Sequence, residues 1–358
     1  MNYKKISLLF TLAALALAGC TAKKGGGGKG KTSGGGKTTP MELTEEQQAI
    51  YEQHYQNKQD CFGDDVSYDL VNPVGSTLQK TIHNYLIDQH KNYVLYTSIA
   101  AGIMNKVDHH PNGGIELFYT GKIVSNYKSG SVAGTQNREH VWPCADSGIS
   151  DNASLWYRNS SIWEWKIDTN SKYWGGGSDL YHIRPADAEV NTTRSNAKFY
   201  QFVDGDGLAR NEKGESGGKY NIIVDDFDNP KRVEVADEFK GDVARLIAYL
   251  YIHYNKMGHD VYYSADATPQ PVYDLSQAVK SGTGSDGKNH DPNVCGRLSL
   301  TYIFNYKTEA ECAAVLKEWN RIDEPSEVEK LRNDTVQNQY QGNRNPFVDF
   351  PQLIDRCF

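Results

Sequence analysis

The chain has 358 residues, of which 38% are hydrophobic, and its formal net charge is −7. Seven of its 38 basic residues precede residue 41, whereas all 45 acidic residues follow it, which leaves 31 basic against 45 acidic residues and a charge of −14. Because such a surface repels phosphate backbones, this composition excludes a protein that coats nucleic acid non-specifically. The length is ample for one substantial globular core.

The N-terminus predicts export and anchoring. Lys4 and Lys5 precede an apolar run over residues 6–17 that is too short to span a bilayer. Leu17-Ala18-Gly19-Cys20 then resembles the lipobox of bacterial lipoproteins, a family in which the chain is cleaved before the cysteine and the thiol receives a lipid. The resemblance implies a signal peptide over residues 1–19, lipidation of Cys20, and a place in the cell envelope, at the outer membrane or the cell surface. A plain secretory peptide is the alternative.

The rest of the chain divides into a tether and one domain. Residues 21–40 are nearly all Gly, Lys, Ser and Thr, so together with lipidated Cys20 they predict a flexible tether over 20–40. Residues 41–358 form one predicted domain. Its cysteines lack CxxC spacing and allow up to two disulfides, whose pairing the sequence leaves open. They are Cys61, Cys144, Cys295, Cys312 and Cys357.

The elements are predicted from periodicity, caps and composition. A capping-box pattern, Thr44-Glu45-Glu46-Gln47, opens a helix over 43–58. Further helices are expected over 78–90, 93–106, 242–254, 308–321 and 325–339, and strands over 115–124 and 179–184 and as a pair within 219–235. Pro185 is expected to open a helix to about Lys198. A loop from Gln341-Gly342 is expected to end the chain. This mixture, without β-α-β alternation, favours an α+β fold.

Two segments carry groups that suit phosphodiester hydrolysis. Residues 137–143 place the carboxyl group of Glu139 beside the imidazole of His140, and residues 179–196 predict strand, turn and helix. A neutral imidazole accepts a proton from water near pH 7. A carboxylate and an amide suffice to hold Mg²⁺, and arginines bind phosphate bidentately. On the predicted helix a polar stripe shares one face: Asp187, Asn191, Arg194 and Lys198.

These segments resemble the endonuclease I family of secreted bacterial nucleases, which includes periplasmic DNases and extracellular ribonucleases. The resemblance extends from about residue 75 and includes Gly241-Asp242-Val243-Ala244-Arg245, Glu329, Arg332-Asn333 and residues 341–349. It implies a mixed α/β body around a ββα-metal (His-Me finger) motif. It also implies that His140 is the general base and that Glu139 and Asn191 bind the metal, Mg²⁺ with Mn²⁺ or Ca²⁺ as alternatives.

Three arginines, the geometry of the strand and two departures from the family pattern add to these expectations. Arg138, Arg184 and Arg194 are expected to contact the substrate, and Arg194 also to assist catalysis, with a salt bridge to the scaffold as the alternative for Arg194. Neighbouring side chains on a regular strand point to opposite faces, so Glu139 and His140 can serve one site only if the backbone bends there. The chain departs from many family members at Tyr181-His182 and at Asp349-Phe350-Pro351. Neither departure touches the expected base or metal ligands.

The sequence therefore predicts a secreted, metal-dependent endonuclease that cuts DNA, RNA or both, and the resemblance implies that its products carry 5′-phosphate ends. Nucleic acid is its expected partner, the membrane is contacted through the lipid, and no obligate protein partner is expected. Histidine pairs such as His253 with His259 do not match a zinc spacing. One alternative is a surface glycan-binding lipoprotein, which leaves the Arg-Glu-His and Asn-Thr-Thr-Arg segments unexplained. Another is an inactive family member that only binds nucleic acid, against which the intact base and ligands argue.

Overall fold

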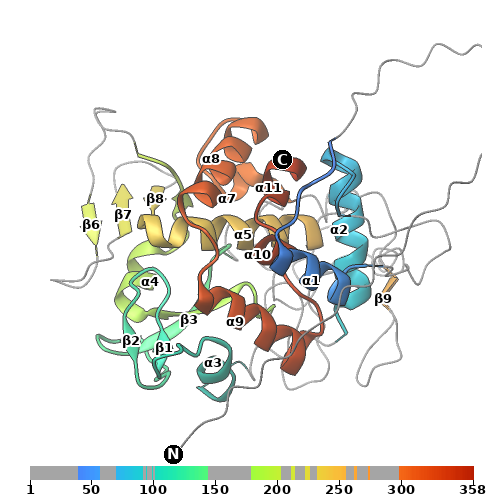
Figure 1. Ribbon diagram of the computed structural model, residues 1–358. Helices are drawn as coiled ribbons and strands as arrows, with labels where there is room; N and C mark the ends of the chain where they lie inside the picture. Colours follow the sequence, from blue (N-terminus) through green and yellow to red (C-terminus); the bar gives the residue numbers. More distant parts are fainter. Residues whose placement is uncertain are drawn as a thin grey trace, which may run out of the picture. The chain divides into compact units, whose positions relative to one another are not determined.

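The computed structural model describes residues 39–56, 70–91, 94, 99, 101–143, 179–202, 211–213, 222–225, 232–254, 262–263, 273–274 and 298–358 (Figure 1). All of them belong to one compact unit, Thr38–Phe358. The predicted signal peptide, the lipidation site Cys20 and the tether up to residue 38 lie outside the described residues. Within those ranges, no helix combines the length and the apolar character needed to cross a membrane.

The long helix α5 (Asp237–Tyr254) forms the centre of the hydrophobic core. Fifteen of its 18 residues are buried, as expected for a helix that is apolar on nearly all sides. It begins five residues before the predicted start. It packs against α2 (Gly75–Gln89), α8 (Glu309–Ile322) and α10 (Pro346–Asp349). The core thus joins elements that are far apart in the sequence.

The shorter helices largely follow their local signals. The predicted capping box opens α1 (Glu45–His54), where the Gln47 backbone N–H donates to Thr44 Oγ1 over 3.2 Å. Helix α9 (Glu327–Val336) continues into a π-helical turn, η5 (Gln337–Gln341). The expected C-terminal loop is wrong in part, because α10 and α11 (Leu353–Cys357) lie within it. Asn345 caps α10 and Pro346 occupies its first turn, a pairing that starts helices readily. The remaining helices are α3 (Ala101–Val107) and α7 (Leu300–Ile303).

The strands are short and mostly antiparallel. Instead of one strand over 115–124, the chain forms a hairpin of β1 (Ile115–Glu116) and β2 (Ile123–Val124). It turns at Tyr119 and Gly121, which have φ of 74° and 63°. The predicted pair within 219–235 is confirmed as β7 (Ile222–Asp225) and β8 (Arg232–Glu234). They lie in a sheet of order β5-β8-β7-β6, with β5 (Lys198–Phe199) and β6 (Asn211–Lys213). A separate pair joins β9 (Tyr262–Tyr263) to β10 (Tyr273–Asp274). The mixture is α+β, as predicted.

An antiparallel strand pair followed directly by a helix carries the two motif segments. Strand β3 (Gln136–His140) pairs with β4 (Ile183–Asp187), and α4 (Ala188–Arg194) follows. The predicted bounds of 179–184 for the strand and of Pro185 for the helix start are wrong. Pro185 lies within β4, and Asp187 begins the helix because its carboxylate accepts from the backbone N–H of Glu189 over 2.9 Å. Lys198 lies in β5, so α4 is one turn shorter than expected.

Two of the five domain cysteines are free. Cys312 and Cys357 are buried thiols, and burial raises the pKa of Cys312 to about 12. Cys61, Cys144 and Cys295 lie outside the described residues. The upper limit for the domain therefore falls from two disulfides to one.

Candidate active site

Helix α4 covers the face of β3 that carries Glu139. Residues two apart on a strand share a face, so Asn137 and Glu139 point to the same side. Asn191 of α4 donates from its side-chain amide to Asn137 Oδ1 over 2.5 Å. One turn further along α4, Arg194 Nη1 lies 3.3 Å from Glu139 Oε1. The strand pair and the helix thereby bring the two expected metal ligands to one side of the strand.

The carboxyl group of Glu139 is buried, with one oxygen held by the protein. The side chain is 3% exposed, and its Oε1 accepts from the Tyr119 hydroxyl over 2.7 Å in addition to facing Arg194. Burial raises the pKa of Glu139, whereas Arg194 and the hydrogen bond from Tyr119 act in the opposite direction and stabilise the anion. Among the described residues, none donates to Oε2. That oxygen is the one left to bind a ligand.

Asn191 is arranged in the same way. It is half-buried, and its amide nitrogen is taken up by Asn137. No hydrogen bond joins its side-chain oxygen to another described residue. One carboxylate oxygen and one amide oxygen are the hard donors that Mg²⁺ prefers, so Glu139 and Asn191 fit the ion expected from the sequence. Their metal role stays a prediction.

The backbone bends at Val141 and Trp142, directly after His140, whereas Glu139 and His140 themselves both pair with β4 inside β3, so their joint service of one site stays a prediction. Arg194 donates from Nη1 to the His140 carbonyl over 3.3 Å and from Nη2 to the Val141 carbonyl over 2.6 Å. Successive carbonyls of a regular strand point in opposite directions, so they cannot both face one guanidinium unless the strand geometry ends there. Val141 and Trp142 form the bend. Arg194 thus holds the chain on both sides of the peptide that follows His140.

A second histidine lies behind the expected base. His182 is fully buried, and its ring centroid lies 5.2 Å from that of half-buried His140 in an edge-to-face arrangement. Its Nε2 lies 3.1 Å from the Trp142 nitrogen and 2.8 Å from the Trp142 oxygen. His182 therefore contacts both the ring of His140 and the bend that follows it. Of the two histidines, His140 is the more accessible.

The three arginines predicted to bind substrate differ in their burial and in the groups that they contact. Arg184 is 5% exposed, donates from Nε to Asp108 over 3.1 Å, and lies over the ring of Phe118. Arg194 is 1% exposed and held as described above. Arg138 is half-buried and donates to the Ile99 carbonyl over 3.2 Å. Arg138 is thus the most accessible of the three, and a phosphate contact by any of them stays a prediction.

A buried group that the sequence analysis missed lies elsewhere in the domain. His90 caps the end of α2, His253 lies in the last turn of α5, and Asp179 precedes β4. Their nitrogen and carboxylate oxygen atoms lie within 4.8 Å of one another, and by its chemistry the group could hold a metal ion. The three residues are widely separated in the sequence. No spacing rule could have joined them.

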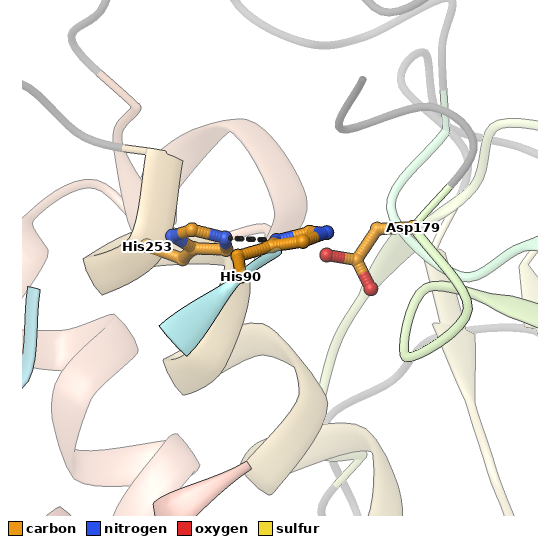
Figure 2. A group of neighbouring side chains, drawn as sticks. All are labelled: His90, Asp179 and His253. Carbon is orange, nitrogen blue, oxygen red and sulfur yellow. Dashed lines mark hydrogen bonds between the residues drawn. The ribbon is translucent and has the colours of Figure 1, made fainter. Parts of the chain in front are cut away.

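The arrangement of this group is that of a line. Figure 2 shows His90 between His253 and Asp179, and His90 Nδ1 lies 2.8 Å from His253 Nε2. Each oxygen of Asp179 already accepts two hydrogen bonds, one oxygen from Tyr249 and Tyr254 and the other from the Tyr181 backbone and Gln341. The group therefore joins α2, α5 and the start of β4.

The comparisons with known proteins agree with the motifs. Residues 71–278 and 301–352 match the family model described as Endonuclease I. An extracellular ribonuclease of Bacillus amyloliquefaciens is 27% identical over 286 residues, which cover 79% of this chain and 74% of that protein. An extracellular ribonuclease of Bacillus subtilis (strain 168) is 29% identical over 287 residues, covering 79% and 75%. Because the family model matches well over half of the sequence, the chain belongs to the endonuclease I family.

Proposed function

We propose that this chain is an exported endonuclease that hydrolyses phosphodiester bonds, with His140 as the general base and Glu139 and Asn191 as ligands of a divalent ion. Family membership and two relatives named extracellular ribonucleases support a secreted nuclease. The observation that carries the residue roles is the packing of α4 on β3. It leaves one oxygen of Glu139 and one of Asn191 without a bond to a described residue.

In the proposed reaction, His140 takes a proton from a water molecule as its oxygen attacks phosphorus. The bond from phosphorus to the 3′ oxygen breaks and that oxygen takes up a proton from solvent, so the products carry 5′-phosphate and 3′-hydroxyl ends. A bound Mg²⁺ would supply positive charge for the phosphate and the leaving oxygen. Arg194 fixes the backbone that carries His140, and His182 packs against its ring. Because water is the nucleophile, the 2′-hydroxyl is not needed and both DNA and RNA are admissible substrates.

Anchoring by a lipid on Cys20 belongs to the same proposal. Its support is the Leu-Ala-Gly-Cys sequence, and a Gly- and Lys-rich tether would let the domain reach substrate away from the membrane. The glycan-binding alternative has no support from the family match. The alternative of an inactive family member differs from the proposed enzyme in one property, because it would bind nucleic acid without turnover.

The test is cleavage of matched DNA and RNA by the purified protein, with end-group analysis. EDTA should abolish cleavage and added Mg²⁺ should restore it. His140→Ala should reduce turnover about 10²-fold or more, the contribution of a general base. Asn191→Ala should be partly rescued by more Mg²⁺, because it weakens ion binding. The matched control is His109→Ala, which removes an exposed histidine outside the site.

Three outcomes would contradict the proposal. Near-wild-type turnover by a folded His140→Ala protein would move the base elsewhere, with His182 the next candidate. Full activity of wild type after chelation and dialysis would remove the metal from the mechanism. A wild-type protein that binds nucleic acid but never cuts it would favour the inactive family member.

A further inference from the structure

Each expected metal ligand has a neighbour that takes up its other polar atom. Glu139 Oε1 accepts from Tyr119, and the Asn191 amide nitrogen donates to Asn137. A side-chain amide whose N–H is engaged has its oxygen turned to the opposite side. In the same way, a carboxylate held at one oxygen presents the other. Both ligands are therefore fixed in orientation by residues that the sequence analysis did not single out.

Tyr119 adopts a backbone conformation that needs a reason. Its φ of 74° is in the left-handed region, which bulky residues rarely adopt. Such conformations persist when the surroundings fix them, and they occur preferentially at functional sites. Here the preceding residue, Phe118, donates from its backbone to the Pro185 carbonyl over 2.8 Å, which docks the β1–β2 hairpin on β4. The turn then directs the fully buried Tyr119 side chain to Glu139.

Asn137, which lies on β3, orients Asn191 as Tyr119 orients Glu139. It lies two residues before Glu139, on the same face of β3, and its Oδ1 accepts the hydrogen bond from Asn191. One strand thus provides a metal ligand and the partner of the other ligand. In metal sites, such outer hydrogen bonds set the orientation of the ligands, and losing one typically costs 10- to 100-fold in affinity or activity.

We propose that Tyr119 and Asn137 are positioning residues that orient Glu139 and Asn191 for the divalent ion. The inference rests on the proposed function, since it concerns the same site. Neither residue takes part in proton transfer, so each acts on the binding of the ion, and the proton-accepting role of His140 is left intact. Removing either side chain should therefore weaken ion binding, and it should lower turnover only when the ion concentration is limiting.

The experiment measures Mn²⁺ binding by electron paramagnetic resonance of the free ion, alongside the Mn²⁺ dependence of cleavage. Tyr119→Phe and Asn137→Ala should each raise the Kd for Mn²⁺ roughly 10- to 100-fold. Turnover at saturating Mn²⁺ should stay close to that of wild type. The matched control is Tyr55→Phe, which removes another fully buried hydroxyl that donates to a carboxylate, Asp349, outside the site. Its Kd should be unchanged.

The outcomes separate this inference from the function on which it rests. Wild-type affinity in folded Tyr119→Phe and Asn137→Ala, with binding lost in Glu139→Gln, would overturn the positioning role and leave the metal site in place. If Tyr119→Phe fails to fold, the Kd of Asn137→Ala decides the question. If wild type itself binds no Mn²⁺, the metal site fails, and the positioning role fails with it.

Discussion

Replacing Arg194 with alanine should cost stability before it costs substrate affinity. The guanidinium is 1% exposed and lies 3.3 Å from the buried carboxylate of Glu139. Removing one partner of a buried ion pair leaves the other charge uncompensated, which typically costs about 3–5 kcal/mol. With an unfolding entropy of about 2.1 cal/mol/K per residue, a domain of roughly 320 residues should lose about 4–7 °C in Tm. The carbonyls of His140 and Val141 also lose their donor.

Thermal unfolding by circular dichroism tests this, with KM measured in parallel on a defined oligonucleotide. Arg321→Ala is the matched control, because its side chain is 55% exposed and its pair with Asp355 lies at the surface. A surface pair contributes at most about 1 kcal/mol, so Tm should change by about 1.5 °C or less. A folded Arg194→Ala protein with unchanged Tm and a strongly raised KM would refute the reasoning. Arg194 would then be chiefly a phosphate ligand.

Three further predictions concern packing, pH and anchoring. Gly241→Ala should destabilise the domain severely, because the added Cβ would lie 1.9 Å from the Asp323 carbonyl oxygen; urea unfolding checks it. Burial and the neighbouring His90 and His83 hold the pKa of His253 well below 6.5. The folded protein therefore favours neutral His253, whereas the unfolded chain takes up a proton there below about pH 6.5. The free energy of unfolding of wild type, relative to that of His253→Gln, should then fall by up to about 1.4 kcal/mol per pH unit as pH drops below about 6.5. Denaturant titrations from pH 7.5 to 5.5 measure this difference. Cys20→Ser should shift the protein out of the membrane fraction, and unchanged fractionation would contradict lipidation.

Local signals predicted the helices better than the strands. The capping box at Thr44 and the apolar stretch of α5 each contain enough information within a few turns to fix an element. The strand over 115–124 was predicted from composition alone, which does not reveal that Tyr119 turns the chain back. A left-handed tyrosine is stabilised by the contacts of the hairpin with β4. Such contacts are not visible in the sequence.

The helix start at Pro185 failed through competition between two sound signals. Proline is favoured in the first turn of a helix, but Asp187 two residues later caps the backbone with its side chain. β4 tolerates Pro185, whose carbonyl accepts the hydrogen bond from Phe118. The consequence for the site is small, because Asn191 and Arg194 keep their places on α4.

The residues of the candidate site could be predicted where they are neighbours within one motif. They could not be predicted where the fold brings together residues that are far apart in the sequence. Glu139 and His140 are adjacent, so their side chains and the required bend could be considered together. Tyr119 is 20 residues from Glu139. His90 and His253 are 163 residues apart. A hydrogen bond across such a separation follows from the packing of hairpin and helices, for which a single sequence offers no distance information.

The acidic charge and the buried arginines together bear on how substrate is held. Among the described residues, five arginines that are at most 5% exposed are engaged in ion pairs inside the protein: Arg184, Arg194, Arg245, Arg332 and Arg344. Each is neutralised by an acidic neighbour, so none of them extends a basic surface toward a phosphate backbone. With a net charge of −14 after residue 41, attraction for the phosphate has to come from local positive charge. A divalent ion at Glu139 and Asn191 would concentrate that charge at the scissile bond, and the more accessible Arg138 lies on the same strand. On this argument the ion serves substrate binding as well as the chemical step.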